Sequence, residues 1–589
     1  MCGIMGCIGE RARTRVVAGL KLLEYRGYDS AGVSFSKGGR VVTVKKKGRI
    51  AELERALKTA EDDSRFAIGH TRWATHGRAC VRNAHPFVSR DRSFALVHNG
   101  IIENHRALRA MLEREGYAFV SETDTECALH LIARDGGANL PSLCKALSAL
   151  EGSYAFAILT NCGEIWAARK NSPLVVGERG GAYFLSSDIR TLSAFASRAA
   201  VLKDGEIARL TARGISLFDA RGNPVPLAFF ETDEAEMREE ADSYMMKEIC
   251  EIPRRIAEAK EHYVRSGGTG LSPAELRSFT RVIFLGCGTA YHSGESAAGF
   301  WRGRAKQEVS AVLASEYLYD RFPTDRSTLA VAISQSGETA DTLRAAALAK
   351  RRGATLFAVT NAKDSSLARA ADRAIPICAG EEVAVASTKA YNCQLIVLYL
   401  MGLEFARAGG TCSAETEEIA AAFDDLPRAV GEVLSEREKI REIAYALSRS
   451  KAFFFLGKRE DLPAAREGAL KLKEISYLFA EACASGELKH GPLALIERGV
   501  TVVLLSTQPD LYEKADNARA EVEGRGASVF AVGTEEERGE FAFRLPAVHP
   551  VLSPVLAAVP LQLFAYYVAE KRGRDIDKPR NLAKSVTVE

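Results

Sequence analysis

The first residue able to do chemistry is Cys2, which directly follows the initiator methionine. Removal of Met1, which a second residue as small as cysteine permits, would place the thiol next to a free α-amino group. That amine titrates at about 7.7 to 8.0, so near neutral pH it can accept the thiol proton, directly or through water. A cysteine at position 2 is by itself more often an ordinary processed terminus than a nucleophile. The segments that follow must therefore decide its role.

Four segments follow Cys2-Gly3-Ile4 in a defined order: EYRGYDSAG (24–32), GHTRWATHG (69–77), HNGIIEN (98–104) and SETDTE (121–126). In this order they resemble the glutaminase domain of the N-terminal-nucleophile amidotransferases. The resemblance implies that Cys2 opens the amide of glutamine through a thioester. It also implies that Asn99 and the backbone N–H of Gly100 stabilise the tetrahedral oxyanion.

The same resemblance assigns residues that bind the charged α-groups of glutamine. It pairs Arg72 with the carboxylate and Asp124 with the ammonium, while Trp73 and His76 shape and close the pocket. Taken singly, Arg72 would be a surface charge and Trp73 a core aromatic. Within an intact GHTRWATHG block, the binding roles are favoured.

The segment SQSGETADT (334–342) lies between an expected strand and an expected helix. Several hydroxyls and backbone N–H groups then converge at a helix N-terminus, an arrangement that binds phosphate but that an ordinary N-cap also produces. The segment resembles part of the sugar isomerase domain. That resemblance implies that the phosphorylated sugar is held by Thr289 of the GCGT turn, Ser334, Gln335, Ser336 and Thr339, with Val385 and Ser387 of VASTKAY (385–391) beside the sugar.

Isomerising a ketose to an aldose requires a base that moves a proton between neighbouring carbons. In EGALKLKEISY (467–477), Glu467, Lys471 and Glu474 are spaced by four and three residues and share one helix face. A solvated salt-bridge ladder has the same spacing. The segments GELKHGPLAL (486–495) and PRNLAKSVTVE (579–589) are not explained by such a ladder.

Together these segments resemble the isomerising glutamine:fructose-6-phosphate aminotransferases over essentially the whole chain. The resemblance implies that Glu474 is the base for the C1/C2 proton shift, that His490 assists ring opening and that Lys584 forms a Schiff base with the open ketose. It implies L-glutamine and fructose 6-phosphate as substrates, and glucosamine 6-phosphate as a product at the start of hexosamine synthesis. Ammonia would travel through an internal channel gated by Trp73. The resemblance also implies a homodimer, with no metal or organic cofactor.

Three details depart from the pattern of this family. Ala290 stands where a serine commonly follows GCGT, Ser243 replaces a histidine, and Gly457-Lys458-Arg459 replaces a Gly-Arg-Gly turn. These departures leave room for a paralogue acting on a related sugar phosphate. A purine-pathway amidotransferase would also begin with such a glutaminase, but it conflicts with SQSGET in the second half. A non-catalytic sugar phosphate sensor would not need Cys2, Glu474 and Lys584 together.

The elements that must position these residues fall into several domains. The apolar runs of residues 2–217, separated by Gly, Asn and Asp turns, predict a sheet-rich domain, which the resemblance identifies as an αββα glutaminase. An acidic linker is expected over 218–245, and the chain is expected to end in an active-site tail, 573–589. Between them, strand-then-helix units predict two doubly wound domains with parallel sheets, at 246–410 and 440–572. Gly286, Ser334 and Thr360 match Gly457, Ser506 and Gly533 at offsets of 171 to 173 residues, which indicates tandem copies of one domain.

Composition excludes several further classes of protein. The 589 residues are 47% hydrophobic, and 79 basic residues against 76 acidic ones give a net charge of +3, which predicts neither nucleic acid nor membrane partners. The apolar stretch 555–569 is too short to span a bilayer and is expected to form a buried helix. The first ten residues lack an export signal, which predicts a cytosolic protein. The twelve cysteines show no CxxC pair, so neither a disulfide framework nor a zinc site is expected.

Overall fold

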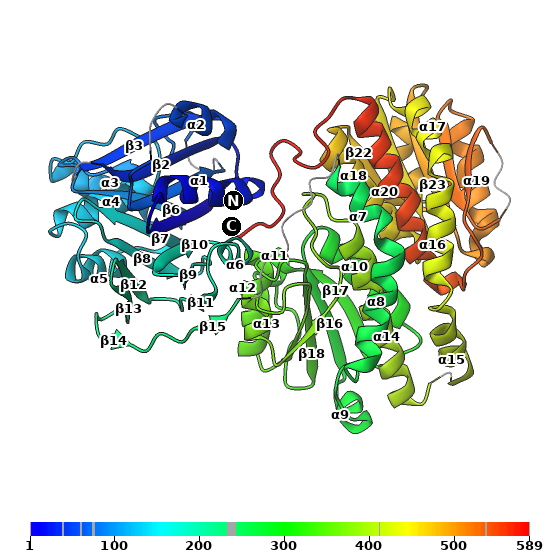
Figure 1. Ribbon diagram of the computed structural model, residues 1–589. Coiled ribbons are helices and arrows are strands. Elements are labelled where there is room, and N and C mark those ends of the chain that lie inside the picture. The colour runs from blue at the N-terminus through cyan, green and yellow to red at the C-terminus, as the bar shows by residue number, and fades with distance from the viewer. Residues whose placement is uncertain are drawn as a thin grey trace. The chain divides into compact units, whose positions relative to one another are not determined.

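The computed structural model describes residues 2–37, 40–58, 62–73, 77–232, 243–411, 413–535 and 539–587. The chain divides into two compact units, which are Met1–Glu239 with Ser585–Glu589, and Glu240–Lys584. Figure 1 shows the first unit in blue to green and the second in green to red. Each unit has its own hydrophobic cores.

The first unit contains two antiparallel sheets among its described residues. One has the order β15-β11-β9-β10-β1-β4-β2-β3, formed by β1 (Gly3–Ile8), β2 (Ser30–Lys37), β3 (Arg40–Lys47), β4 (Phe66–Arg72), β9 (Val175–Arg179), β10 (Ala182–Ser186), β11 (Arg198–Val201) and β15 (Phe230–Glu231). The other has the order β14-β13-β12-β8-β7-β6-β5, formed by β5 (Phe87–Val88), β6 (Phe94–Ile102), β7 (Gly152–Thr160), β8 (Ile165–Lys170), β12 (Ile207–Thr211), β13 (Gly214–Phe218) and β14 (Pro224–Val225).

These two sheets form the middle layers of a four-layer sandwich. Side chains alternate along a strand, so Ile4 and Ile8 of β1 pack into the core between the sheets, while Met5 and Cys7 face helices on the other side. The outer face of the first sheet carries α1 (Ala12–Leu22), α2 (Ile50–Leu57) and α6 (Ile189–Ser193). The second sheet is covered by α3 (His105–Arg114), α4 (Thr125–Arg134) and α5 (Leu140–Ser148). The predicted αββα arrangement is confirmed.

The second unit contains two parallel sheets of the same topology. The first has the order β17 (Glu308–Leu313), β16 (Arg281–Gly286), β18 (Thr328–Ser334), β19 (Thr355–Thr360) and β20 (Arg373–Pro376). The second has the order β22 (Ala480–Ala484), β21 (Ala452–Gly457), β23 (Val500–Ser506), β24 (Ser528–Gly533) and β25 (Phe541–Arg544). Each residue pair that indicated the tandem repeat falls at the ends of equivalent strands, and the two doubly wound copies are confirmed.

Helices surround both parallel sheets. They are α7 (Tyr244–Cys250), α8 (Ile252–Arg265), α9 (Pro273–Ser278), α10 (Thr289–Trp301), α11 (Ala314–Tyr317), α12 (Ala340–Arg351), α13 (Ser366–Ala370), α14 (Lys389–Gly409), α15 (Ser413–Ala422), α16 (Leu426–Ser435), α17 (Arg437–Leu447), α18 (Asp461–Ser476), α19 (Tyr512–Glu523) and α20 (Ser553–Lys571). The segment Pro550–Lys571, which includes α20, is long and apolar enough to cross a membrane, but 94% of its most apolar window is buried inside the unit. It is the buried helix that the sequence predicts at 555–569.

The boundary between the units differs in detail from the predicted linker. Two short strands, β14 and β15, extend the sheets of the first unit past residue 217, and α7 begins at Tyr244. Strands of two residues leave no alternating pattern for sequence analysis to detect. Most of the acidic segment, residues 233–242, lies outside the described residues.

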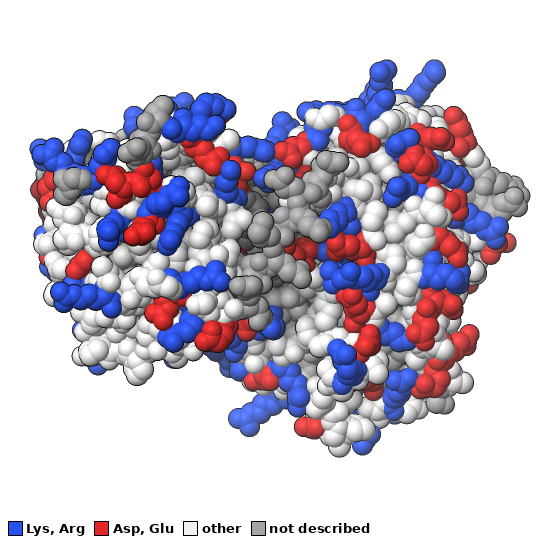
Figure 2. Space-filling model, viewed as in Figure 1, with Lys and Arg blue, Asp and Glu red and all other residues white. Residues whose placement is uncertain are grey.

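Charged residues of both signs lie interspersed over the visible face of each unit (Figure 2).

Candidate active sites

Strand pairing places Cys2 beside the GHTRWATHG block. β1 runs antiparallel to β4 with Gly3 opposite Thr71, so Cys2 comes next to the residues that end β4. The backbone N–H of Trp73 lies 3.3 Å from the Cys2 sulfur, and the Trp73 carbonyl oxygen lies 3.5 Å from it. A Cβ at position 3 would lie 2.7 Å from Leu23 Cβ and from Thr71 Oγ1, which explains the glycine that follows the cysteine.

The two predicted oxyanion groups lie at the end of β6. Asn99 donates from Nδ2 to the carbonyl oxygen of Cys2 at 2.9 Å, so its amide faces the nucleophile's own residue. Nε2 of His70 is 3.0 Å from both Asn99 Oδ1 and the carbonyl oxygen of His98. Both are acceptors, so Nε2 carries the proton and fixes the Asn99 amide in this orientation. Gly100 has a φ of +127°, and a Cβ there would lie 2.2 Å from the Ser153 carbonyl oxygen.

The predicted glutamine-binding charges gather around the same cysteine. Arg72 is buried and interacts electrostatically with Cys2, Asp124 and Asp29. Asp124 is also buried and accepts the backbone N–H of Ile102 at 2.8 Å, which fixes it beside the end of β6. The Trp73 ring meets Tyr28 edge to face, with ring centroids 5.9 Å apart. His76, the remaining predicted residue of this pocket, lies outside the described residues.

Electrostatics at this site oppose spontaneous ionisation of the thiol. Burial raises the pKa of Cys2, while the Trp73 N–H and the Arg72 charge partly offset that rise. Burial also lowers the pKa of His70 to about 3, so this ring stays neutral and serves as a hydrogen-bond donor. The thiol therefore needs a base close by, which agrees with the role predicted for a free α-amino group on Cys2.

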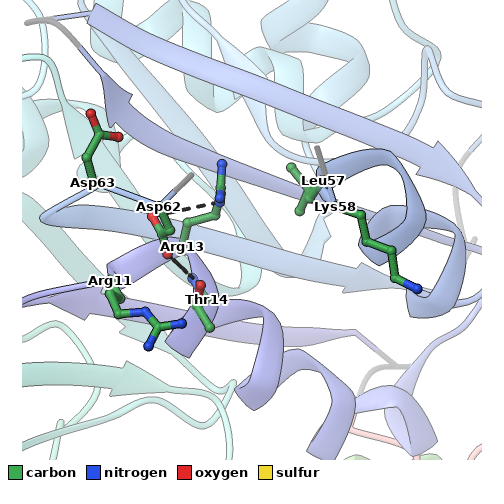
Figure 3. A pocket seen from close by; sticks show the side chains of 7 residues that line it. All are labelled: Arg11, Arg13, Thr14, Leu57, Lys58, Asp62 and Asp63. Atoms are coloured by element: carbon green, nitrogen blue, oxygen red, sulfur yellow. Dashed lines mark hydrogen bonds and ion pairs between the residues drawn. The ribbon is translucent and has the colours of Figure 1, made fainter. Parts of the chain in front are cut away.

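A separate hollow on the first unit, shown in Figure 3, holds none of these residues. Its volume is about 600 Å³, and it is lined by Arg11, Arg13, Thr14, Leu57, Lys58, Asp62 and Asp63. Asp62 accepts hydrogen bonds from the Thr14 hydroxyl at 2.6 Å and its backbone N–H at 2.8 Å, and it pairs with Arg13. Its carboxylate thus caps the first turn of α1.

In the second unit, the predicted phosphate loop joins β18 to α12. The Ser334 hydroxyl accepts the Gly337 N–H at 3.0 Å and lies 3.0 Å from the Thr339 hydroxyl. Gly337 has a φ of +65°, and a Cβ there would lie 2.0 Å from Ser365 Oγ. Gln335 accepts the Asn361 N–H through its carbonyl, and the Ser336 hydroxyl accepts the Glu338 N–H at 3.2 Å. These contacts hold the turn at the N-terminus of α12.

The predicted acid–base face of α18 is buried at Glu467 and Lys471 and half-buried at Glu474, and it contacts α10. Lys471 Nζ lies 3.3 Å from Glu467, 2.7 Å from Glu474 and 3.1 Å from the Thr289 hydroxyl. Glu467 also accepts from Thr289 at 2.9 Å and lies 2.8 Å from His292 Nδ1. Glu467 and Lys471 are 1% and 0% exposed, so they do not form a solvated ladder.

This network keeps Glu467 and Lys471 charged. Burial raises the pKa of Glu467, but Lys471, His292 and Thr289 outweigh it and leave the pKa below its ordinary value. Burial by itself would lower the pKa of Lys471, but the carboxylates of Glu467 and Glu474 have the larger effect and raise it above its ordinary value. Lys471 therefore stays charged, and Glu474 lies beside a fixed cation.

The C-terminal tail brings Lys584 to the VASTKAY segment. Its ammonium donates to the carboxylate of Glu382 and, at 3.1 Å, to the hydroxyl of Ser387. The N–H of Val385 donates to the Asp577 carbonyl at 3.0 Å, which attaches the tail to the same segment. Burial raises the pKa of Glu382, but the Lys584 charge and the N–H groups of Thr388 and Ala390 outweigh it and keep this carboxyl ionised.

Among the described residues, no hydrogen bond links His490 to the Lys584 cluster or to the charged face of α18. His490 ends the short helix η2 (Glu487–His490) and is exposed. Two residues that contact the predicted ones, Glu382 and His292, were not predicted from the sequence. Glu382 lies five positions before Ser387, and His292 lies three after Thr289, one helical turn along α10. Proximity to predicted residues was the only sequence signal for either.

Comparison with known families agrees with both units. Residues 70–194 match the glutamine amidotransferase domain, and residues 275–403 and 446–570 match the SIS domain. The fold and the sites thus define a glutamine amidotransferase joined to a tandem sugar isomerase module.

Relatives match over the full length of the chain. It is 45% identical over 609 aligned positions to the glutamine–fructose-6-phosphate aminotransferase (isomerizing) of Symbiobacterium thermophilum and 42% identical to that of Clostridium acetobutylicum, covering 100% of each chain in both cases. The solved C-terminal domain of the Francisella tularensis glucosamine-fructose-6-phosphate aminotransferase is 33% identical, with a TM-score of 0.56, and covers 58% of this chain and 100% of its own. The chain belongs to the glutamine–fructose-6-phosphate aminotransferase (isomerizing) family.

Proposed function

We propose that this enzyme transfers the amide nitrogen of L-glutamine to D-fructose 6-phosphate. Ketose-to-aldose isomerisation accompanies the transfer, and the products are L-glutamate and D-glucosamine 6-phosphate. The observation that carries the proposal is the match over the full length to relatives named for this reaction. The clustering of Cys2 with Asn99, and of Lys584 with Ser387, supports it.

In the proposed glutaminase step, the Cys2 sulfur attacks the amide carbon of glutamine. The carbon–nitrogen bond breaks, ammonia leaves, and water then hydrolyses the thioester to glutamate. Asn99 Nδ2 and the Gly100 N–H stabilise the negative oxygen of the tetrahedral intermediates. Arg72 and Asp124 hold the two charged α-groups of the substrate, and Trp73 and His76 close over it.

In the proposed sugar step, the loop at Ser334–Thr339 and Thr289 hold the phosphorylated ketose. Val385, Ser387, Glu467 and Lys471 lie beside the sugar, and His490 assists ring opening. The Lys584 amine forms an imine with the ketone carbon and releases water, and ammonia then displaces the lysine. Glu474 moves a proton from C1 to C2, which converts the ketose imine into the amino aldose.

Ammonia that reached bulk water would be protonated and lose its nucleophilicity. We therefore propose a sheltered passage between the two reactions, gated by Trp73. A cytosolic location, a homodimeric assembly and chemistry without a cofactor complete the proposal.

The test is to incubate the purified protein with glutamine and fructose 6-phosphate and to quantify glutamate and amino-sugar phosphate. The wild type should release equal amounts of both. Cys2→Ala should lose both with glutamine as donor but regain amino sugar when ammonium chloride replaces glutamine, because the sugar site is untouched.

Glutamate without amino sugar would contradict the acceptor and direct attention to Ala290, where the family commonly has serine. Full glutamine-dependent activity in Cys2→Ala would contradict the nucleophile. Mass spectrometry of the protein establishes whether Met1 is removed, since a retained Met1 would silence the glutaminase step.

A further inference from the structure

A second buried carboxyl, Glu248, lies behind the segment that holds Lys584. It belongs to α7 and is 3% exposed. One of its oxygens accepts the backbone N–H of Val383 and, at 3.1 Å, that of Ala384. Because these residues directly follow Glu382, the carboxyl of Glu248 fixes the backbone next to the ion pair of Lys584.

The other oxygen of Glu248, Oε2, has no hydrogen-bond partner among the described residues. A buried carboxylate oxygen without a donor is more costly than the oxygen of a protonated carboxyl, because removing a charge from water costs more than removing a neutral polar group. The charged groups that act on Glu248 are Glu382, across the loop, and Lys584, on the tail. Burial and the neighbouring Glu382 charge raise the pKa of Glu248 well above its usual range, despite the opposing effects of Lys584 and the two N–H donors.

Glu382 has the opposite environment. It receives hydrogen bonds from Lys584, the Ser387 hydroxyl at 3.0 Å, and the N–H groups of Thr388 and Ala390 at 2.9 and 3.1 Å. The nearby Glu251 is paired with Lys389 at 2.6 Å, so that cation is not free to compensate a charge on Glu248. Of two neighbouring carboxyls, only Glu382 is surrounded by donors.

We propose that Glu248 is a positioning residue for Lys584, acting as an uncharged acid that fixes the Glu382–Thr388 segment and leaves a single negative charge opposite the lysine. The inference rests on the proposed function, because it concerns the imine that Lys584 forms with the ketose.

A single negative charge matters because the lysine must become neutral before it can attack a carbonyl carbon. Glu382 is in contact with the ammonium and is ionised at rest, so it can take up the lysine proton transiently as the amine attacks. A second charge on Glu248 would hold the proton on Lys584.

The attachment of α7 to the tail supports this role. The Asp577 carboxylate accepts the N–H groups of Tyr244 and Met245 at 2.9 and 2.8 Å, at the start of the helix that carries Glu248. The carbonyl oxygen of Asp577 accepts the Val385 N–H. Helix, segment and tail are therefore joined at two places, and Glu248 makes the contact next to Glu382.

The test uses the full-length enzyme with fructose 6-phosphate and borohydride, which reduces the imine to a stable secondary amine that mass spectrometry quantifies at Lys584. Wild type, Glu248→Gln, Glu248→Ala and the control Glu261→Gln are compared at about pH 6.5 and about pH 9. Glu261 is exposed on α8, where it pairs only loosely with Arg265 at 3.6 Å.

We expect Glu248→Gln to match the wild type at the lower pH, because a neutral amide replaces a neutral acid and its oxygen still accepts both N–H groups. At the higher pH the glutamine cannot ionise, so this variant should trap about tenfold more sugar than the wild type. Glu248→Ala should trap less at both pH values, and Glu261→Gln should follow the wild type.

A pH profile of Glu248→Gln identical to that of the wild type would overturn the inference, since a merely structural residue would not change it. Loss of trapping in Glu248→Gln at the lower pH would also overturn it, because that result would require a charged carboxylate. If the wild type forms the adduct, either of these results overturns the inference about Glu248 but leaves the proposed function intact. Absence of any adduct in the wild type would reject the Schiff base and the inference with it.

Discussion

At the scale of single residues, burial determines what a charged side chain can do. Glu467, Lys471 and Glu474 have a spacing that a solvated ladder shares, yet Lys471 is fully buried between two carboxylates. An exposed pair of this kind contributes at most about 1 kcal/mol, whereas an unpaired buried charge costs several times more. The cation is therefore a structural requirement as well as a neighbour of the proposed base.

The first prediction concerns this cation. Lys471→Met removes the charge at similar volume and leaves Glu467 buried with His292 and Thr289 as its remaining partners. We expect the second unit to lose about 3 to 5 kcal/mol of stability, read as a lower Tm in calorimetry. Lys473→Met, on the exposed face of the same helix, should change stability by less than about 0.5 kcal/mol. Equal effects of the two substitutions would contradict the importance of the buried network.

At the scale of elements, the two parallel-sheet copies differ in the turn after their equivalent strands. After β18, the turn carries Ser334 to Thr339, with its glycine at positive φ. After β23, the Thr507 N–H donates to Asp461 at 3.0 Å, and the Thr507 hydroxyl donates to the same carboxylate. Burial raises the pKa of Asp461 to about 6, although these donors lower it. In the second copy, the donors of this turn are therefore already bonded to the carboxylate of Asp461.

The second prediction tests the turn of the first copy. Gly337→Ala would place a Cβ 2.0 Å from Ser365 Oγ, whereas a Cβ at Gly303, also at positive φ, meets nothing within 4 Å. Both alanines should cost about 1 to 2 kcal/mol of backbone strain. Only Gly337→Ala should also raise the KM for fructose 6-phosphate, by about tenfold, which corresponds to about 1.4 kcal/mol of lost binding. Steady-state kinetics with ammonium chloride as donor measures this effect separately from the glutaminase. An unchanged KM in Gly337→Ala would remove the loop from the sugar site.

Element boundaries show where sequence patterns are weak. The helix predicted from residue 467 in fact begins at Asp461. The sequence pattern did not indicate these first turns, because they contain a proline and charged residues that carry little periodicity. The two-residue strands β14 and β15 were absorbed into the predicted linker for the same reason. Long buried strands such as Val500–Ser506 leave a clearer pattern, since a continuous apolar run bounded by polar turns is distinctive.

At the scale of the whole molecule, each unit has its own cores, and each proposed substrate is assigned to residues of one unit. A ligand that binds only a folded unit stabilises that unit, by about 2.7 kcal/mol at one hundred times its Kd.

The third prediction follows from this separation. In calorimetry of the Cys2→Ala variant, which cannot consume glutamine, glutamine should raise the Tm of one transition and fructose 6-phosphate that of the other. Asparagine, which is one methylene shorter than glutamine, serves as the control and should shift the first transition less. A single transition that responds equally to both substrates would contradict independent units.

The sequence by itself determined the fold class, the tandem repeat and the family, because ordered motifs and strand-end residues survive as local patterns. It also nominated Cys2, Asn99, Lys471 and Lys584, whose site roles are still predictions to be tested. Only the tertiary structure decided that Lys584 faces Glu382, that Glu248 lies buried beside this pair, and that Lys471 is enclosed rather than solvated. These facts depend on contacts between residues far apart in the chain and on the water that packing excludes, and neither leaves a periodic signal in the sequence.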